Sequence, residues 1–300
     1  MKILLTGASG HLGYATTREL EKQGHEVVAL VRPSSNLKGL EGTRAQIAYG
    51  DVLDPAAVRK FARDCTAIIH QAAVYRLDMD KPEEIIRPAV EGTRNVLEAA
   101  SELGIKRVVY TSSIASIGAS TSPDQLLDGT TWNTSTALPY AEAKTQSERI
   151  AHELARTLGL ELMVMCPGAI MGPGDYRVTP SHGIILALTS GGPIPAGGFN
   201  PVSVFDVASL HVQALTRGVP FKRYVAASRD NITYRQTYDI LRAIAGAGFK
   251  EAPDGEVGPA YYAYYNIAET LKDFQYDPMA ARDALKSAYD WLTFTGALKL

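Results

Sequence analysis

The sequence has few cysteines, little excess charge and no long apolar run. It contains two cysteines, Cys65 and Cys166, each within an apolar stretch, so we expect reduced core residues and neither a disulfide nor a metal site. The formal net charge of -2 gives no reason to expect a nucleic acid or an anionic membrane as partner. No apolar run is long enough for a transmembrane helix, and the first run stops at Gly7, too early for a secretory signal. A cytoplasmic protein is expected.

What the chain does have is ordinary for a globular protein. Of its 300 residues, 46% are hydrophobic and 21% are charged, which is enough for a sizeable core. Up to Cys166, short apolar runs alternate with amphipathic stretches. The runs predict buried strands at residues 2–7, 25–32, 45–52, 66–73, 106–113 and 160–168. The stretches between them predict helices at residues 11–24, 55–64, 82–104 and 140–159. This alternation predicts an α/β fold, a doubly wound parallel Rossmann sheet with helices on both faces.

After Cys166 glycine and proline become frequent, which predicts loops at residues 167–183 and 189–201. The pattern of strand and helix returns at residues 202–218. We therefore expect a smaller, mixed C-terminal substrate lobe beside the sheet domain. The expected dinucleotide-binding Rossmann domain comprises residues 1–166 with 201–226, and the expected substrate-binding lobe comprises residues 167–200 with 227–300.

Two features of this lobe can be interpreted from the sequence. Residues 231–248 have helical spacing, with Asn231 as a candidate N-cap. The tyrosine cluster at residues 260–266, "AYYAYYN", is expected to pack in the core or between the lobes, and a substrate platform is the alternative.

A glycine-rich loop follows the first predicted strand. The stretch "TGASGHLG" at residues 6–13 spaces its glycines as G-x-x-G-x-x-G, one residue longer than the usual dinucleotide fingerprint. Such glycines allow a tight turn, close approach of a pyrophosphate and helix packing, while the helix N-terminus offers free N–H groups to phosphates. A plain turn is the alternative, but strand, loop, helix and strand occur in the order that favours dinucleotide binding. The candidate contacts are Gly7, Ser9, Gly10, His11 (through its backbone), Leu12 and Gly13.

The end of the second predicted strand bears on the choice of cofactor. NAD-binding units usually carry an acidic residue there, which binds the ribose 2′-hydroxyl. This sequence has Val31 followed by Arg32, so no carboxylate repels a 2′-phosphate and a guanidinium can pair with it. NADP(H) is therefore favoured over NAD(H). The alternative is that Arg32 only stacks on the adenine.

Taken together, eight segments resemble the extended short-chain dehydrogenases/reductases, within the epimerase/dehydratase superfamily. They follow the family's order over most of the chain, and residues 86–100 are most similar to its dihydroflavonol and cinnamoyl-CoA reductase branch. The segments are "TGASGHLG", "GDVLDP", "IIHQAA", "VEGTRNVLEAA", "RVVYTSSIASIG", "YAEAK", "CPGAIMGPGD" and "VSVFDVASLHVQAL".

The resemblance implies a role for several positions. Tyr140 and Lys144 match the family's Tyr-x-x-x-Lys pair, and Ser113 matches its catalytic hydroxyl, with Ser112 as the neighbouring candidate. Many members carry an asparagine where this chain has Ala89, which leaves open how Tyr140 regains its proton. A homodimer through helices at residues 82–103 and 140–159 is also suggested. Further implied cofactor contacts are Asp51 and Val52 beside the adenine, Ala72 and Ala73 beside a ribose, and Pro167 to Ile170 beside the nicotinamide.

These residue types suit carbonyl reduction. Hydride transfer to a carbonyl creates an alkoxide that needs a proton, but a phenol has an ordinary pKa of about 10. A nearby ammonium favours the phenolate and so lowers that pKa. We therefore expect Tyr140 to donate the proton, Lys144 to lower the pKa of Tyr140, and Ser113 to stabilise the carbonyl oxygen.

The sequence thus predicts an NADP(H)-dependent oxidoreductase that reduces a small-molecule ketone or aldehyde to an alcohol. The alternatives are a nucleotide-sugar epimerase or dehydratase with tightly held NAD(P), and a non-catalytic redox-sensing protein. No metal is expected, because His182, His211 and Asp206 lack the spacing of metal ligands. We expect the substrate to be selected by the C-terminal lobe and by loops at residues 75–82, 119–138 and 171–200.

Overall fold

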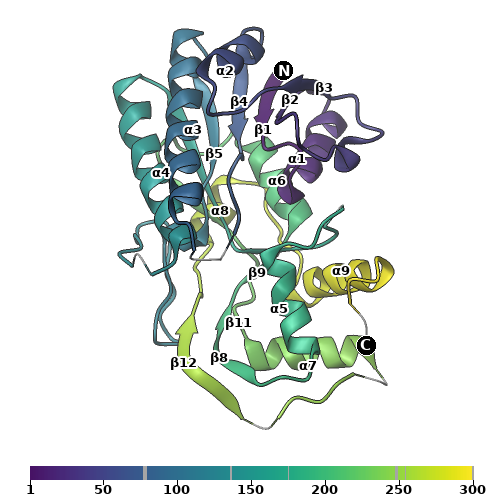
Figure 1. Ribbon diagram of the computed structural model, residues 1–300. Coiled ribbons are helices and arrows are strands. Elements are labelled where there is room, and N and C mark those ends of the chain that lie inside the picture. The colour runs from purple at the N-terminus through teal and green to yellow at the C-terminus, as the bar shows by residue number, and fades with distance from the viewer. Residues whose placement is uncertain (77–79, 136, 175, 247–248, 254, 299–300) are drawn as a thin grey trace.

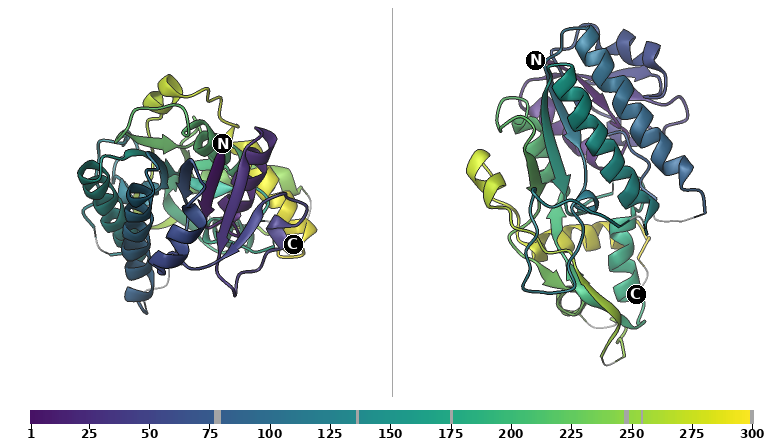
Figure 2. Two further views of the ribbon diagram at one scale, coloured as in Figure 1. Left: turned by 90° about the horizontal axis from the view of Figure 1, so that it is seen from above. Right: turned by 90° about the vertical axis from the view of Figure 1, so that its left-hand side faces the viewer.

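The protein consists of a larger sheet domain with a smaller lobe below it in the view of Figure 1. The two additional views in Figure 2 show the same arrangement from above and from the side. The structure, a computed structural model, describes residues 1–76, 80–135, 137–174, 176–246, 249–253 and 255–298.

A seven-stranded sheet, counted over the described residues, forms the centre of the larger domain. Its strand order is β10-β6-β5-β4-β1-β2-β3, and every neighbouring pair is parallel. The order reverses beside β1, so a crevice is expected outside the carboxyl ends of β1 and β4. The strands are β1 (Lys2–Thr6), β2 (Glu26–Val31), β3 (Gln46–Tyr49), β4 (Ala67–His70), β5 (Arg107–Thr111), β6 (Glu161–Pro167) and β10 (Arg223–Ala226).

Helices cover both faces of this sheet, as the alternating pattern predicted. On one face α3 packs along α4 and against α2, and on the other α1 packs against α6 (Figure 1). The doubly wound α/β fold is therefore confirmed. The helices are α1 (His11–Lys22), α2 (Pro55–Ala62), α3 (Glu83–Glu102), α4 (Pro139–Thr157) and α6 (Val204–Gln213).

Burial on both faces explains why the strands are continuous apolar runs. In β1, Leu4 belongs to the core beneath α2, α3 and α4, whereas Ile3 and Leu5 belong to the core beneath α1 and α6. Each of these side chains is fully buried. Burying one such side chain contributes roughly 1.5–3 kcal/mol relative to leaving it exposed, so a polar residue on either face of β1 would be costly.

The smaller lobe has its own apolar core and a mixed sheet, in agreement with the sequence. In its three-stranded sheet, again within the described residues, the order is β11-β8-β12. β8 is antiparallel to β11 and parallel to β12. A short parallel pair, β7 with β9, lies next to it. α8 (Ala268–Asp273) instead packs against β10 of the central sheet. The other elements after β6, apart from α6 and β10, are β7 (Ala169–Met171), α5 (Pro180–Thr189), β8 (Ile194–Phe199), β9 (Pro201–Ser203), β11 (Ile232–Thr233), α7 (Tyr234–Ala245), β12 (Glu256–Tyr262) and α9 (Ala281–Phe294).

Two details of the lobe differ in how well the sequence predicted them. The proposed N-cap Asn231 is wrong: α7 is capped by Thr233, which forms a reciprocal capping box with Gln236. The tyrosine cluster does pack between segments, since the Tyr265 hydroxyl donates to the Gly118 carbonyl oxygen at 2.5 Å. Tyr262 pairs with Ser120 in an isolated β-bridge. The tyrosine cluster therefore joins the smaller lobe to the loop that follows β5.

The remaining general expectations can be compared with the described residues. Cys65 and Cys166 are both buried free thiols. Over the described part of the chain, no helix combines the length and the apolar composition that crossing a bilayer requires.

Candidate active site

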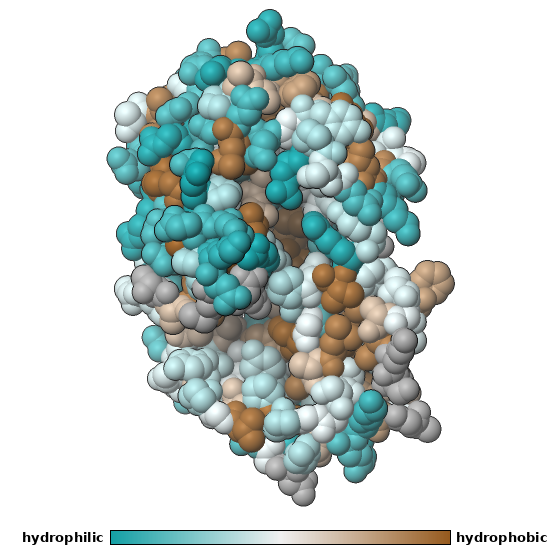
Figure 3. Space-filling model, viewed as in Figure 1, coloured by the Kyte–Doolittle hydropathy of each residue, from teal (hydrophilic) through white to brown (hydrophobic). Residues whose placement is uncertain are grey.

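A cavity of about 310 Å³ opens at the carboxyl ends of the central strands, where the sheet domain meets the smaller lobe. Figure 3 shows the surface hollowed in this middle region. Many of the residues singled out in the sequence line this cavity. They are Gly7, Gly10, His11, Leu12, Gly13, Ala73, Ser113, Tyr140, Lys144, Pro167 and Ile170. The other candidates, Ser9, Arg32, Asp51, Val52 and Ala72, are not among its lining residues.

The glycine-rich loop is shaped by contacts that a side chain would prevent. Gly7 has a φ of +74°, and a Cβ there would lie 2.7 Å from the Ala72 backbone nitrogen. A Cβ on Gly13 would lie 2.1 Å from the Gly7 carbonyl oxygen. Both positions therefore need glycine. The loop ends at Gly10, the N-cap of α1, which has no side-chain cap and no acidic residue in its first turn. The first N–H groups of α1 thus remain available to an anionic group, so the loop fits a dinucleotide pyrophosphate.

His11 is not positioned as a cation for that anionic group. Its ring lies 5.0 Å from the ring of His182 in α5. Burial, followed by the influence of His182, lowers the pKa of His11 to about 3. The imidazole is therefore neutral near pH 7 and lies against His182 of the smaller lobe, so a backbone contact of His11 with the cofactor stays a prediction.

The residues expected beside the adenine lie at the ends of β2 and β3 and do not line the cavity. Arg32 follows β2 with an exposed side chain, and among the described residues it has no ion-pair partner. The Asp51 carboxylate accepts a hydrogen bond from the Leu53 backbone nitrogen at 3.0 Å and so orders the turn after β3. Val52 packs against α3, where a Cβ on Gly92 would lie 2.8 Å from it.

Ser113, Tyr140 and Lys144 line the cavity together, at the carboxyl end of β5 and the first turns of α4. Ser113 follows β5 and caps a short helical turn, accepting from the Ala115 nitrogen at 3.1 Å. Tyr140 is the second residue of α4, and Lys144 follows one turn later. The Lys144 ammonium donates to the Thr111 carbonyl oxygen at 2.9 Å, which fixes the lysine beneath the end of β5.

Burial is the largest influence on the pKa values of Tyr140 and Lys144. Burial, with a further contribution from Tyr75, raises the pKa of Tyr140 above its ordinary value, while an interaction with the Ser113 side chain acts in the opposite direction. Burial lowers the pKa of Lys144 to about 8, and the Glu148 carboxylate opposes that shift. The net shift of the Tyr140 pKa is thus opposite to the lowering expected from Lys144, because burial dominates it. Near pH 7 the phenol is therefore protonated and the ammonium is mostly charged.

Ser112, the neighbouring candidate, is engaged elsewhere. Its hydroxyl donates to the carboxylate of Glu148 in α4. Glu148 is fully buried and forms an ion pair with Arg223 of β10. Burial alone would raise the pKa of Glu148, but His152 and Arg223 together hold the pKa below its ordinary value. Since the Ser112 hydroxyl is bound to this carboxylate, Ser113 is the better candidate for the substrate oxygen.

Sequence reasoning missed several cavity residues, which come from loops whose contacts cannot be read from local patterns. The Tyr75 ring lies 4.8 Å from the Tyr140 ring at 45°, and the Tyr75 hydroxyl lies 3.2 Å from the Ser181 oxygen. Tyr75 thus bridges the phenol of the sheet domain to α5 of the lobe. Both residues fall in loops that were expected to select the substrate, but no motif marked them individually.

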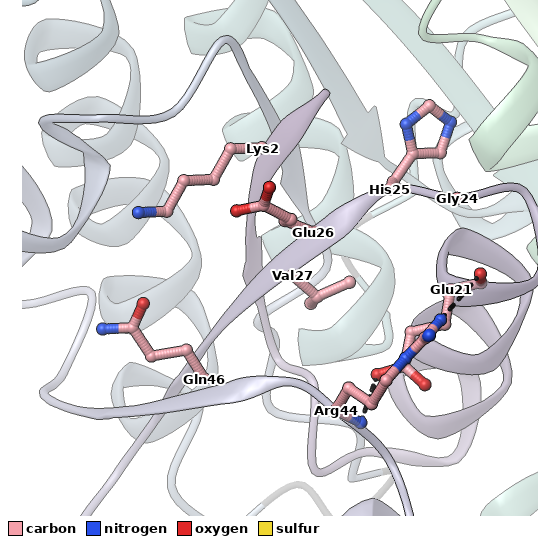
Figure 4. A pocket seen from close by; sticks show the side chains of 8 residues that line it. All are labelled: Lys2, Glu21, Gly24, His25, Glu26, Val27, Arg44 and Gln46. Carbon is pink, nitrogen blue, oxygen red and sulfur yellow. Dashed lines mark hydrogen bonds between the residues drawn. The ribbon is translucent and has the colours of Figure 1, made fainter.

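A second hollow lies at the opposite edge of the sheet, near the amino ends of β1, β2 and β3 (Figure 4). Its volume is about 350 Å³. There the backbone nitrogen of Arg44 donates to the Glu21 carboxylate at 2.6 Å, and its guanidinium donates to the Glu21 carbonyl oxygen. Because ligands of open parallel sheets bind at the carboxyl ends of the strands, the cavity at Tyr140 is the candidate site.

Comparison with known proteins places the chain in a family. The model of the NAD dependent epimerase/dehydratase family matches residues 3–227. The chain belongs to this family. The sequence is 30% identical to cinnamoyl-CoA reductase 1 of Oryza sativa subsp. japonica, over 99% of this chain and 92% of that protein. It is 29% identical to dihydroflavonol 4-reductase of Hordeum vulgare (91% and 84%). It is also 30% identical to sterol demethylase protein B of Methylococcus capsulatus (82% and 75%).

Solved structures show the same fold. The crystal structure of gox2253 has a TM-score of 0.90 at 29% identity, covering 99% of each chain. Yeast methylglyoxal/isovaleraldehyde reductase Gre2, complexed with NADPH, has a TM-score of 0.86 at 20% identity and covers 99% of this chain and all of that one. The UDP-glucose 4-epimerase of Thermus thermophilus, complexed with NAD, has a TM-score of 0.82 at 20% identity, with the same coverage. The family and its reductases support an NAD(P)-binding oxidoreductase of the extended short-chain type, as the motifs predicted.

The buried ion pair generates a stability prediction. Glu148→Gln removes the charge that faces Arg223 and leaves a guanidinium buried without its counterion. Breaking a buried pair in this way typically costs about 3–5 kcal/mol, so the free energy of unfolding in urea should fall by that amount. Glu153→Gln, the same change at an exposed position of α4, is the matched control and should stay within about 0.5 kcal/mol of the wild type. Equal effects of the two substitutions would contradict the role of the pair.

Proposed function

We propose that the protein is an NADP(H)-dependent reductase that converts a ketone or aldehyde into an alcohol. The observation that carries the proposal is the convergence of Ser113, Tyr140 and Lys144 on one cavity that the glycine-rich loop also lines. The reductases among the relatives support the same reaction class. The small-molecule substrate would enter between Tyr75 and the loops of the smaller lobe.

Each residue of the trio has a defined task in this proposal. The nicotinamide cofactor supplies the hydride when it is bound. Tyr140 donates the proton, and its raised pKa keeps the phenol protonated before transfer. Ser113 donates a hydrogen bond to the carbonyl oxygen, where negative charge develops. Lys144 places an ammonium one helical turn from Tyr140, which favours the phenolate left after proton transfer.

The backbone around Ala89 bears on the return of the proton. Ala89 is buried in α3 against Ile85 and Ala143, and its carbonyl oxygen accepts from the Thr93 hydroxyl at 2.7 Å. An alanine side chain carries no proton. We therefore propose that Tyr140 is reprotonated by water admitted to the cavity and not through a side chain at position 89.

The cofactor preference rests on Arg32. Its exposed guanidinium follows β2, where no carboxylate would repel a 2′-phosphate, and Gre2 offers a related fold bound to NADPH.

For the division of the chain, we propose a cofactor-binding domain of residues 1–166 with 201–226 and a substrate lobe of residues 167–200 with 227–300. The homodimer through α3 and α4 remains a prediction. Exposed charges on α3 pair within the helix, for example Arg87 with Glu91 at 3.0 Å, and light scattering would test the association.

An epimerase or dehydratase acting on a nucleotide sugar is the second candidate, favoured by the family match. A panel of carbonyl compounds, followed by NADPH and NADH absorbance in parallel, separates the two. A reductase consumes the added cofactor stoichiometrically. Tightly bound cofactor without net consumption would favour the epimerase or dehydratase. Cofactor binding without turnover of any compound would instead indicate a redox-sensing protein.

Removing the phenol hydroxyl should stop the reaction but not cofactor binding. Tyr140→Phe is expected to lower the turnover of a carbonyl substrate by at least about 100-fold, since general acid catalysis typically contributes 10²–10⁴-fold. The dissociation constant of NADPH, measured by fluorescence titration, should change little. Tyr261→Phe, at an exposed tyrosine of β12, provides the control. Unchanged turnover in Tyr140→Phe would remove Tyr140 from the mechanism.

The dependence of the reduction rate on pH should reveal the loss of the proton from the Lys144 ammonium. Because the pKa of Lys144 is lowered to about 8, the ammonium is present below that pH and is lost as the pH rises through it. The reduction rate, measured as kcat/KM, should therefore fall above pH 8. In Lys144→Arg the cation persists, because an arginine pKa exceeds 12, so the fall should move to a higher pH in the residual activity. An identical basic limb in both proteins would assign it to another group.

Charge reversal at Arg32 tests the cofactor preference. Arg32→Glu introduces a carboxylate at this position. A carboxylate there repels a 2′-phosphate and can accept a hydrogen bond from the ribose 2′-hydroxyl of NADH. The ratio of kcat/KM for NADPH to kcat/KM for NADH should shift towards NADH by at least about 10-fold, a change of about 1.4 kcal/mol. Arg63→Glu, at an exposed arginine after α2, should leave the ratio unchanged. If Arg32→Glu also leaves it unchanged, Arg32 does not recognise the 2′-phosphate.

A further inference from the structure

A segment of the smaller lobe crosses the glycine-rich loop of the sheet domain. This overlying segment comprises residues 172–174 and 176–182. The Tyr176 hydroxyl donates to the Ser9 carbonyl oxygen at 2.9 Å. The Tyr14 hydroxyl, from α1, donates to the Pro173 carbonyl oxygen at 2.9 Å. These two bonds hold the overlying segment directly against the loop expected to bind the cofactor pyrophosphate.

Arg177 lies at the centre of this contact. Its Nη2 atom is 3.4 Å from the position that a Cβ on Gly10 would occupy, so the guanidinium lies over the loop at the N-cap of α1. Arg177 also lines the same cavity as Gly7, Gly10 and Gly13. Its guanidinium lies beside the Tyr176 ring, 5.4 Å from the ring centre. Among the described residues it has no carboxylate partner.

The charges around the cavity favour an anionic ligand at this point. Among the described residues that line it there is no aspartate and no glutamate, whereas Lys144 and Arg177 are both cationic. Lys144 is committed to the Thr111 carbonyl oxygen beneath β5, and the neutral His11 supplies no charge. Of the two cations among the described lining residues, Arg177 is therefore the one whose guanidinium lies over the N-cap of α1. A planar guanidinium can bind two phosphate oxygens at once.

We propose that Arg177 binds the pyrophosphate of the dinucleotide, so that the substrate lobe itself holds the cofactor. The proposal rests on the proposed function in requiring that the chain binds NAD(P). It assigns a phosphate contact to a lobe that the glycine fingerprint does not include. It also separates the tasks of two arginines: Arg32 recognises the 2′-phosphate, which NAD lacks, whereas Arg177 recognises a group that both cofactors share.

Equilibrium binding of NADPH and NADH to the full chain tests this division. Arg177→Gln should raise the dissociation constants of both cofactors by about 10- to 100-fold, the range expected for losing a charge-assisted hydrogen-bonded contact. Arg177→Lys retains the charge and should recover part of the affinity. Arg282→Gln, at an exposed arginine of α9 in the same lobe, should change neither constant. Binding of the wild type should weaken more steeply with added salt than that of Arg177→Gln, because one ionic contact has been removed.

Other outcomes would overturn the proposal in distinguishable ways. Unchanged dissociation constants in Arg177→Gln, combined with a raised KM for the carbonyl substrate, would assign the guanidinium to the substrate. A loss restricted to NADPH would assign it to the 2′-phosphate. A lowered unfolding temperature in Arg177→Gln, with no recovery in Arg177→Lys, would assign it a structural role. If the wild type itself binds neither cofactor, the proposed function fails, and this inference fails with it.

Discussion

The buried ion pair of Glu148 and Arg223 is the interaction on which the geometry of the candidate site depends. Glu148 belongs to α4, the helix that carries Tyr140 and Lys144, and Arg223 belongs to the edge strand β10. The carboxylate also accepts from Ser112 at the end of β5, while the guanidinium donates to the Ser116 carbonyl oxygen at 3.2 Å and the Gly129 carbonyl oxygen at 3.0 Å. One pair of charges therefore joins four segments of the chain.

Such a pair is not an efficient source of stability. Removing two charges from water costs several kcal/mol for each ion, and well-packed apolar residues often stabilise a core as well or better. Its effect is geometric, because a carboxylate with several directional partners accepts only one arrangement of α4 against β5. Ser113 follows Ser112 directly, and Tyr140 lies two helical turns before Glu148. Fixing Glu148 consequently fixes the separation between the hydroxyl and the phenol that face the cavity.

The sequence predicted those parts of the structure that chemistry within one element determines, such as the apolar run of β1 and the glycine-rich loop. The N-cap of α7 shows the limit of local rules, since Asn231 and Thr233 are both good caps. The Asn231 side-chain oxygen instead accepts from the Tyr265 nitrogen at 2.9 Å, in another segment. The missed contacts also join distant positions: Tyr75 meets Ser181 from 106 residues away. Such a contact depends on how the smaller lobe packs against the sheet domain, which local sequence patterns do not specify. The sequence therefore identified the loops around the cavity but not the individual side chains, such as Tyr75 and Ser181, that contact one another there.

The placement of Arg177 and Ser181 on one segment links two functions that are usually considered separately. Arg177 lies over the glycine-rich loop, and Ser181 bonds to Tyr75, whose ring lies against Tyr140. The two residues are four positions apart: Arg177 precedes α5, and Ser181 is the second residue of that helix. Within the described residues, the contact of Arg177 with the glycine-rich loop and the contact of Ser181 with Tyr75 therefore depend on the placement of the same part of the smaller lobe. In the proposed binding mode, a dinucleotide held by Arg177 would therefore also stabilise the contact of Ser181 with Tyr75, the ring that lies against Tyr140.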